Sequence, residues 1–131
     1  MLAALAVGAQ TTAIPAEGER LRDAEAELLF RGAAYAAAIR SFREAERRLP
    51  LSLDELAEPS GATGRRHIRR LYGDPMGEGW TLLRGPDGGI SGVASSAGGA
   101  PRRRAFFPPG YEEFAGAEAY SDWEFAADGG S

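Results

Sequence analysis

The sequence contains no cysteine, and this absence excludes several kinds of chemistry at once. Without cysteine, the chain cannot form a disulfide, bind a metal ion through thiolates or use a thiolate as a nucleophile. Lysine and asparagine are absent as well, so all 15 basic residues are arginines. We interpret this, together with the high alanine and glycine content, as a composition bias of the gene. The arginines are therefore weak evidence for phosphate recognition.

A single histidine, His67, limits catalytic and metal chemistry further. One histidine cannot build a histidine-based metal cluster, and a serine triad could use no other. No Gly-x-Ser-x-Gly motif accompanies it, and a chain without lysine has no Gly-x-x-x-x-Gly-Lys phosphate loop. The glycine-rich stretch GDPMGEGWTLLRGPDGG, residues 73–89, then indicates turns rather than a ligand cradle. We expect a protein that is not an enzyme and has no small-molecule substrate.

The net charge of −4 gives no general attraction to nucleic acid or to anionic membranes. The segment RRHIRR, residues 65–70, carries four arginines without the interleaved aromatic residues typical of single-strand binding. We therefore expect no nucleic-acid partner. The segment is better explained as a solvated arm, or as a partner for acidic groups on a neighbouring subunit.

The apolar N-terminal run, residues 1–9, is shorter than the ~20 residues needed to span a bilayer. A signal peptide would begin with positively charged residues, and none precede this run. Val7, Gly8 and Ala9 nevertheless form an acceptable cleavage site. A third interpretation is that residues 1–14 are the remnant of a transmembrane helix whose first part is missing. The remaining pattern of the chain favours this third interpretation.

Residues 15–49 are predicted to form one long amphipathic helix, since the segment 17–48 lacks proline and is rich in strong helix formers. Apolar residues recur there at every seventh position and form a single stripe. Arg31 also falls on this stripe, without an explanation. The residues expected to carry the packing of the structure are Leu21, Leu28, Tyr35, Phe42, Leu49, Trp80 and Trp123.

The predicted helix is long relative to the rest of the chain. The segment 17–48 would make a rod of ~48 Å, whereas a compact globule of 131 residues is only ~36 Å across. The helix should therefore protrude from a globular head, residues 50–131. At the start of this head, Ser52 and Glu55 have the spacing of a capping box for a short helix.

The head contains three predicted strands. GWTLLRG and GGISGVASS read as two strands joined by a GPDGG turn. In YSDWEFAA, residues 120–127, Trp123 and Phe125 are expected on a buried face, with Tyr120 and Glu124 on the other. The aromatic segment FFPPGYEEF between them is expected to pin a long loop onto the sheet edge. The sequence thus predicts an α+β fold, in which a long N-terminal helix packs on about three antiparallel strands.

The order of these parts resembles the type IV pilin-like proteins, closest to the pseudopilins of type II secretion systems. The likeness covers most of residues 21–126. After the helix, the family's Tyr-Pro-x-x-Leu-x-x-Leu pattern is matched by Leu49, Pro50, Leu53 and Leu56. The family's Leu-x-x-Asp-Pro-x-Gly pattern and Ser-x-Trp-like end are matched by Leu71, Asp74, Pro75, Gly77, Ser121, Asp122 and Trp123. The family's Gly-Phe-Thr-Leu peptidase site is absent, and so is the disulfide found in many type IV pilins.

The resemblance implies a structural subunit of a type II secretion or type IV pilus-like filament. It implies an inner-membrane anchor with a periplasmic head, and as partners other pseudopilin subunits and the secretion machinery. Major pseudopilins hold calcium in the last long loop, where only Glu118 and Asp122 stand near an equivalent place here, so we expect no cofactor and leave calcium as a minor alternative. The alternative function is a periplasmic binding or adaptor module that uses the arginine-rich arm or the aromatic loop.

Overall fold

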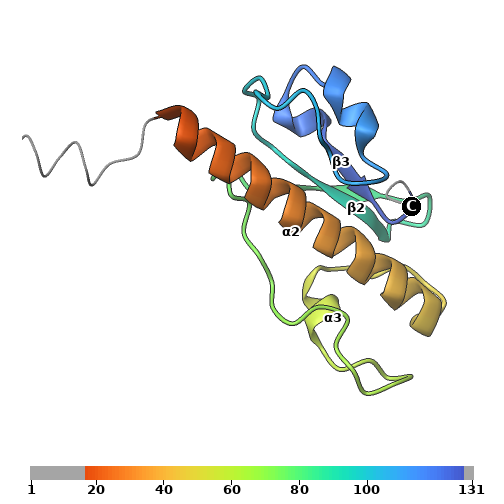
Figure 1. Ribbon diagram of the computed structural model, residues 1–131. Coiled ribbons are helices and arrows are strands. Elements are labelled where there is room, and N and C mark those ends of the chain that lie inside the picture. Colours follow the sequence, from red (N-terminus) through yellow and green to blue (C-terminus); the bar gives the residue numbers. More distant parts are fainter. Residues whose placement is uncertain (1–16, 129–131) are drawn as a thin grey trace, which may run out of the picture.

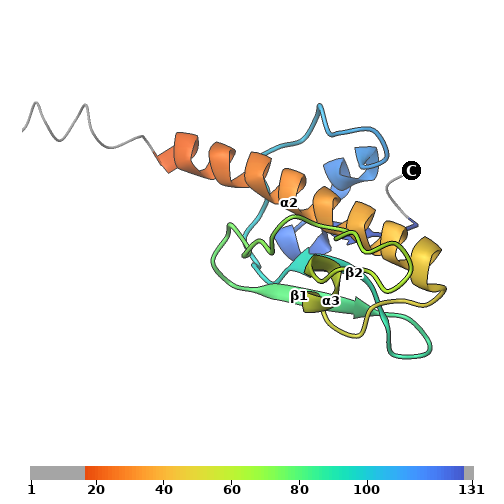
Figure 2. The same cartoon turned by 90° about the horizontal axis from the view of Figure 1, so that it is seen from below.

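The computed structural model describes residues 17–128 of the chain. One long helix, α2 (Glu17–Glu46), lies across a three-stranded antiparallel sheet with the strand order β1-β2-β3 (Figure 1). The predicted α+β layout, with a long N-terminal helix on a small antiparallel sheet, is confirmed. The first turns of α2 extend beyond the sheet, and most of their side chains are exposed (Figure 2).

The helix ends earlier than the predicted residue 49. Arg47 has a positive φ of 62°, and its N–H donates to the Arg43 carbonyl oxygen at 2.9 Å. A residue in this left-handed conformation cannot continue a helix, so the chain turns there. Leu49 consequently lies beyond the helix, in the irregular connection, where it packs partly buried against the core. Residues 15 and 16 lie outside the described residues.

The predicted hairpin is present as β1 (Trp80–Arg84) and β2 (Ile90–Ser95). In the turn that joins them, the N–H of Gly85 donates to the Gly89 carbonyl oxygen at 2.7 Å. Gly88 has a φ of 88°, a conformation that favours glycine. Strand β2 is the central strand, and its residue Val93 is completely buried in the apolar core.

The predicted third strand is only partly correct. Its first residues form a 3-10 helix, η2 (Tyr120–Asp122), and only β3 (Glu124–Ala126) pairs with β2. Tyr120 was expected on the exposed side of a continuous strand, but it is buried, because the 3-10 turn points its ring inward. Trp123 and Phe125 are both completely buried, as the alternation predicted.

Two helical segments complete the head: α3 (Asp54–Ala57) and the 3-10 helix η1 (Glu112–Gly116). The predicted capping box before α3 is only half formed. The Glu55 carboxylate accepts the N–H groups of Leu51 and Ser52, but the helix begins after Leu53, which has no side-chain cap. The Ser52 hydroxyl is therefore one position too early to cap it. The arginine-rich segment 65–70 is irregular, and of its side chains only Ile68 is buried.

The helix lies very close to the sheet at Gly32. A Cβ atom built on Gly32 would lie 2.3 Å from Cδ2 of Phe125, on the outer strand β3. Phe125 itself is fully buried. The glycine is thus the position that allows α2 to approach β3. Near the helix end, Arg40 Nε donates to the Ala127 carbonyl oxygen at 2.9 Å and holds the residue after β3.

We expect Gly32→Ala to lower the free energy of unfolding, by about 2 kcal/mol, although alanine favours helix formation by up to ~1 kcal/mol over glycine. The added methyl group overlaps the Phe125 ring and must push the helix from the sheet. Urea unfolding measures the change. Gly18→Ala is the matched control in the same helix, because its Cβ would meet only the end of the flexible Arg102 side chain at 3.3 Å. Equal stabilisation by both substitutions would contradict the expectation.

No helix within residues 17–128 combines the length and the apolar character needed to cross a lipid bilayer. The predicted remnant of a transmembrane helix, residues 1–14, lies outside the described residues. The membrane anchor therefore stays a prediction.

Candidate interaction surface

The residues predicted to carry the packing contribute unequally to the core. Five lie within α2 or the sheet, and two lie in the connecting segments. Leu28, Tyr35, Phe42 and Trp123 are buried, whereas Leu21, Leu49 and Trp80 are partly buried and pack against the core. The centroids of the Phe42 and His67 rings lie 5.5 Å apart. Phe42 therefore packs against the segment that follows the helix as well as against the sheet.

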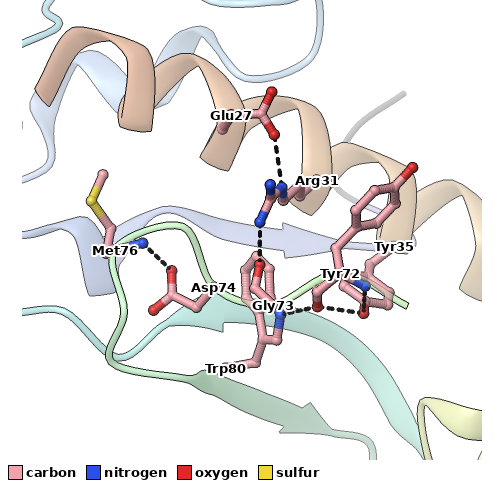
Figure 3. Close-up of polar contacts among 8 residues, drawn as sticks. All are labelled: Glu27, Arg31, Tyr35, Tyr72, Gly73, Asp74, Met76 and Trp80. Carbon is pink, nitrogen blue, oxygen red and sulfur yellow. Dashed lines mark hydrogen bonds and ion pairs between the residues drawn. The ribbon is translucent and has the colours of Figure 1, made fainter. Parts of the chain in front are cut away.

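Tyr35 joins the middle of α2 to the segment that leads into β1 (Figure 3). Its hydroxyl donates to the Tyr72 carbonyl oxygen and accepts the Tyr72 N–H, both at 2.8 Å. Trp80 Nε1 donates to the same carbonyl oxygen at 2.9 Å, and its ring lies edge-on to the Tyr35 ring. Burial raises the pKa of the Tyr35 phenol, which therefore remains a hydrogen-bond donor. The hairpin is thus fixed to the helix at its first residue.

Arg31 lies one helical turn before Tyr35 and has a role that the apolar stripe did not predict. Its guanidinium donates through one terminal nitrogen to the Gly73 carbonyl oxygen at 3.0 Å, and through Nε to the Glu27 carboxylate at 2.7 Å (Figure 3). A charged residue can occupy the stripe because its donors are satisfied at the edge of the interface. Gly73 follows Arg31 by 42 residues in the sequence, so no local pattern indicates this contact.

Asp74, in the glycine-rich stretch, is fully engaged in the turn before β1. Its carboxylate accepts the N–H groups of Met76 at 3.0 Å and Glu78 at 3.2 Å, and the Ser95 hydroxyl at 2.8 Å. These bonds occupy the oxygens that a bound ligand would need. The interpretation of this stretch as turns agrees with the geometry.

A buried carboxylate, Glu25, is the functional candidate that sequence reasoning missed. Only 2% of Glu25 is exposed, although it lies on α2 among charged neighbours. One carboxylate oxygen accepts the Arg102 N–H at 2.6 Å, the Arg103 N–H at 3.3 Å and the Tyr120 hydroxyl at 2.7 Å. Glu25 thereby connects α2 to the long loop and to η2. The only sequence signal is its place on the inward side of the helix, one turn before Leu28 and Leu29.

We expect the free energy of unfolding to fall as the pH rises above about 10, the ordinary pKa of tyrosine. Burial, followed by the Glu25 carboxylate, raises the pKa of Tyr120 in the folded chain. Tyr120 therefore ionises at a lower pH in the unfolded chain than in the folded chain, so alkaline pH favours unfolding. Its contribution to the free energy of unfolding is fully present below the pKa of the unfolded state. The chain has neither lysine nor cysteine, so tyrosine side chains dominate this pH range. Burial also raises the pKa of Tyr111.

Urea unfolding of the wild type and of Tyr120→Phe, each at neutral and at alkaline pH, measures this dependence. The substitution removes a hydrogen bond and lowers stability at neutral pH, so the comparison concerns only the decline between the two pH values. The decline should be smaller for Tyr120→Phe. Identical declines would show that Tyr120 does not contribute.

His67 lies beside α2 and does not complete a catalytic arrangement. Its Nδ1 is 2.7 Å from the Ser41 hydroxyl, and its buried Nε2 has no hydrogen-bond partner among the described residues. A serine activated by histidine needs a third group that orients the imidazole ring, and the ring lies instead edge-on to Phe42. The pair attaches the arginine-rich segment to the helix.

The two candidate calcium ligands, Glu118 and Asp122, line one cavity together with Glu113 and Glu124, but the four carboxylates do not gather closely enough to hold a metal ion. Asp122 uses its carboxylate to accept the N–H groups of Glu118 at 3.2 Å and Ala119 at 3.0 Å, which closes the turn into η2. Across residues 17–128, no three histidine, aspartate or glutamate side chains lie close enough to hold a metal ion. The geometry gives the calcium alternative no ligand set in this part of the chain.

The long loop, residues 101–111, places its aromatic residues on opposite sides. Tyr111 is buried against Phe114 and Phe125, and Phe107 packs partly buried against the Trp123 ring. These contacts agree with the expected pinning of the loop. Phe106, in contrast, is 95% exposed and has a φ of 62°, which is unfavourable for a bulky residue. In Figure 2 this blue loop projects past α2 on the side opposite β1.

An apolar groove of about 620 Å³ lies between α2 and this loop, and we call it the α2–loop groove. It is lined on one side by α2 residues, mostly small, and on the other by loop residues that include Arg103 and two phenylalanines. Phe30, on the helix, is 58% exposed. The main lining residues are Ala26, Phe30, Ala33, Phe106, Phe107 and Pro108. An exposed apolar surface of this kind is typical of a site for another apolar segment.

The chain matches no protein-family model, no curated protein and no solved structure. The case for a function therefore rests on the residues and contacts described above.

Proposed function

We propose that the protein is a structural subunit of a filament of the type II secretion or type IV pilus-like kind, as a pseudopilin or minor pilin. The observation that carries the proposal is the shape of the chain. A helix of 30 residues packs on a small sheet by its C-terminal part and extends its N-terminal turns beyond it (Figure 1). Residues 1–16, which precede the helix, contain no charged side chain. A projecting helix with an apolar start suits an assembly in which helices pack together.

In this proposal, the helices form the core of the filament, and the head groups set the spacing between subunits. Burial of apolar side chains provides the stabilisation, while charges on the exposed helix face and on head loops fix the lateral register. Glu19, Arg22 and Asp23 are exposed on the projecting turns. The subunit would be held at the inner membrane before assembly, with its head in the periplasm, and would act by packing rather than by catalysis.

Single cysteines in this cysteine-free chain test the proposal in intact cells. Arg22→Cys places a thiol on the projecting turns, and Ser52→Cys places an exposed thiol at the opposite end of the helix as the matched control. We expect oxidation to link subunits through residue 22 in membrane or filament preparations, with little linkage through residue 52. Monomers alone for both variants, together with no filaments by electron microscopy, would contradict the filament proposal.

Exposed groups of the long loop support a second candidate, a periplasmic binding or adaptor module. Phe106 is almost completely exposed, and Arg102, four residues earlier in the same loop, is exposed as well. An aromatic side chain next to a guanidinium is a common element of protein interfaces. In the arginine-rich arm, Arg70 lies over the Tyr72 ring at 5.1 Å, so part of that arm already has a partner within the chain. The loop is therefore the better surface for an adaptor.

A further inference from the structure

The α2–loop groove exposes apolar surface that the described part of the chain does not cover. Its two aromatic walls, Phe30 and Phe106, are 58% and 95% exposed. The Phe106 backbone is in an unfavourable left-handed conformation, and the Arg103 guanidinium supports it by donating to the Phe106 carbonyl oxygen at 2.9 Å. A bulky residue kept in such a conformation indicates that its outward position has a use. The groove is thus a formed site that suits an apolar occupant.

The same chain carries an apolar segment of matching character. Residues 1–16 have no charged side chain, and residues 1–7 consist only of methionine, leucine, alanine and valine. Leu2, Leu5 and Val7 are the larger side chains that could enter the groove. Two complementary apolar surfaces on one chain favour each other because both are removed from water when they meet.

The connecting residues are long enough for this contact. The groove is centred near Phe30, 13 residues after Glu17, which corresponds to ~20 Å along the helix. Residues 8–16 can span up to about 30 Å when extended. The segment can therefore reach the groove without strain.

We propose that the apolar segment formed by residues 1–7 folds back and docks in the α2–loop groove of its own chain. A second copy could offer the same segment, but a connection of nine residues gives an effective concentration in the millimolar range, far above that of a dilute protein. Docking hides the segment from water and from other molecules. A membrane or another subunit must then displace it before the segment can insert or pack elsewhere. This inference concerns the single chain in solution and does not depend on the proposed filament.

Cysteine pairs in the full chain test this docking. Leu5→Cys with Ala33→Cys places one thiol on the segment and one in the groove. Leu5→Cys with Glu27→Cys is the matched control, since Glu27 is exposed on the same helix but does not line the groove. Both pairs are oxidised at low micromolar protein concentration, and the products are identified by mass spectrometry and by gel electrophoresis without reductant.

We expect disulfide formation within one chain to be roughly tenfold faster for the groove pair than for the control pair. Phe106→Glu added to the groove pair should slow it roughly tenfold, because a charged side chain replaces an apolar wall. Phe106 is exposed, so the fold should remain, and circular dichroism checks this. Equal rates of disulfide formation for the two pairs would overturn the proposal. Disulfide-linked dimers in place of linked monomers would also overturn it, because they would assign the groove to a second copy.

Discussion

Phe42→Ala is expected to lower the free energy of unfolding by about 3–5 kcal/mol, the range observed for large-to-small changes of buried phenylalanines. Phe42 is 4% exposed and belongs to the apolar core. Its ring lies edge-on to His67 and under the Arg48 guanidinium, with distances of 5.5 Å and 5.0 Å. Removal of the ring leaves a cavity at the point where the helix, its end and the following connection meet. Urea unfolding followed by circular dichroism measures the loss.

Phe30→Ala is the matched control, because it removes the same side chain from the same helix at a position that is 58% exposed. This change should alter stability by about 1 kcal/mol or less. Phe42→Leu should fall between the two, since it retains much of the buried apolar volume. An unchanged unfolding curve for Phe42→Ala would refute the packing role of the stripe.

The features that could be predicted from the sequence are those set by local patterns. The seven-residue spacing of Leu28, Tyr35 and Phe42 predicted a buried helix face because two turns of a helix contain about seven residues. The hairpin followed from its turn sequence, since glycine is favoured at the positive φ of Gly88. In both cases the determining residues lie within a few positions of one another.

The features that were missed depend on contacts between distant parts of the chain. The helix ends at Arg47 without the glycine that usually marks a helix end, because an arginine adopts the left-handed conformation there. Tyr120 was expected outside because strand alternation was extended through η2. Arg31 fell on the apolar stripe without an explanation and Glu25 was not singled out, since their partners lie 42 and 77–95 residues away.

The projecting helix and the α2–loop groove bear on function through the same element. The face of α2 toward the sheet is occupied by packing, whereas Phe30 and Ala33 remain open to a further apolar segment. The groove exists only while the long loop stays beside the helix. The loop is attached there by its backbone, through the N–H groups of Arg102 and Arg103 on the Glu25 carboxylate. Loss of that attachment should therefore affect both the stability of the fold and the shape of the groove.

Glu25→Ala is accordingly expected to lower the free energy of unfolding by about 3 kcal/mol. The substitution removes the shared acceptor of the Tyr120 hydroxyl and the Arg102 N–H, and each buried donor left without a partner costs ~1–3 kcal/mol. Urea unfolding measures the total loss, and hydrogen exchange at the amides of Arg102 and Arg103 reports whether the loop detaches. Both amides should exchange faster than in the wild type.

Two further variants separate the buried acceptor from a general effect of charge. Glu44→Ala removes an exposed carboxylate from the same helix and should change stability by about 0.5 kcal/mol or less. Glu25→Gln keeps one oxygen as an acceptor for the same donors, so its loss should be smaller than that of Glu25→Ala. If Glu25→Ala were no more destabilising than Glu44→Ala, the carboxylate would not be what holds the loop. The α2–loop groove would then have to be maintained by other contacts of the loop, such as those of Phe107 with Phe114 and Trp123.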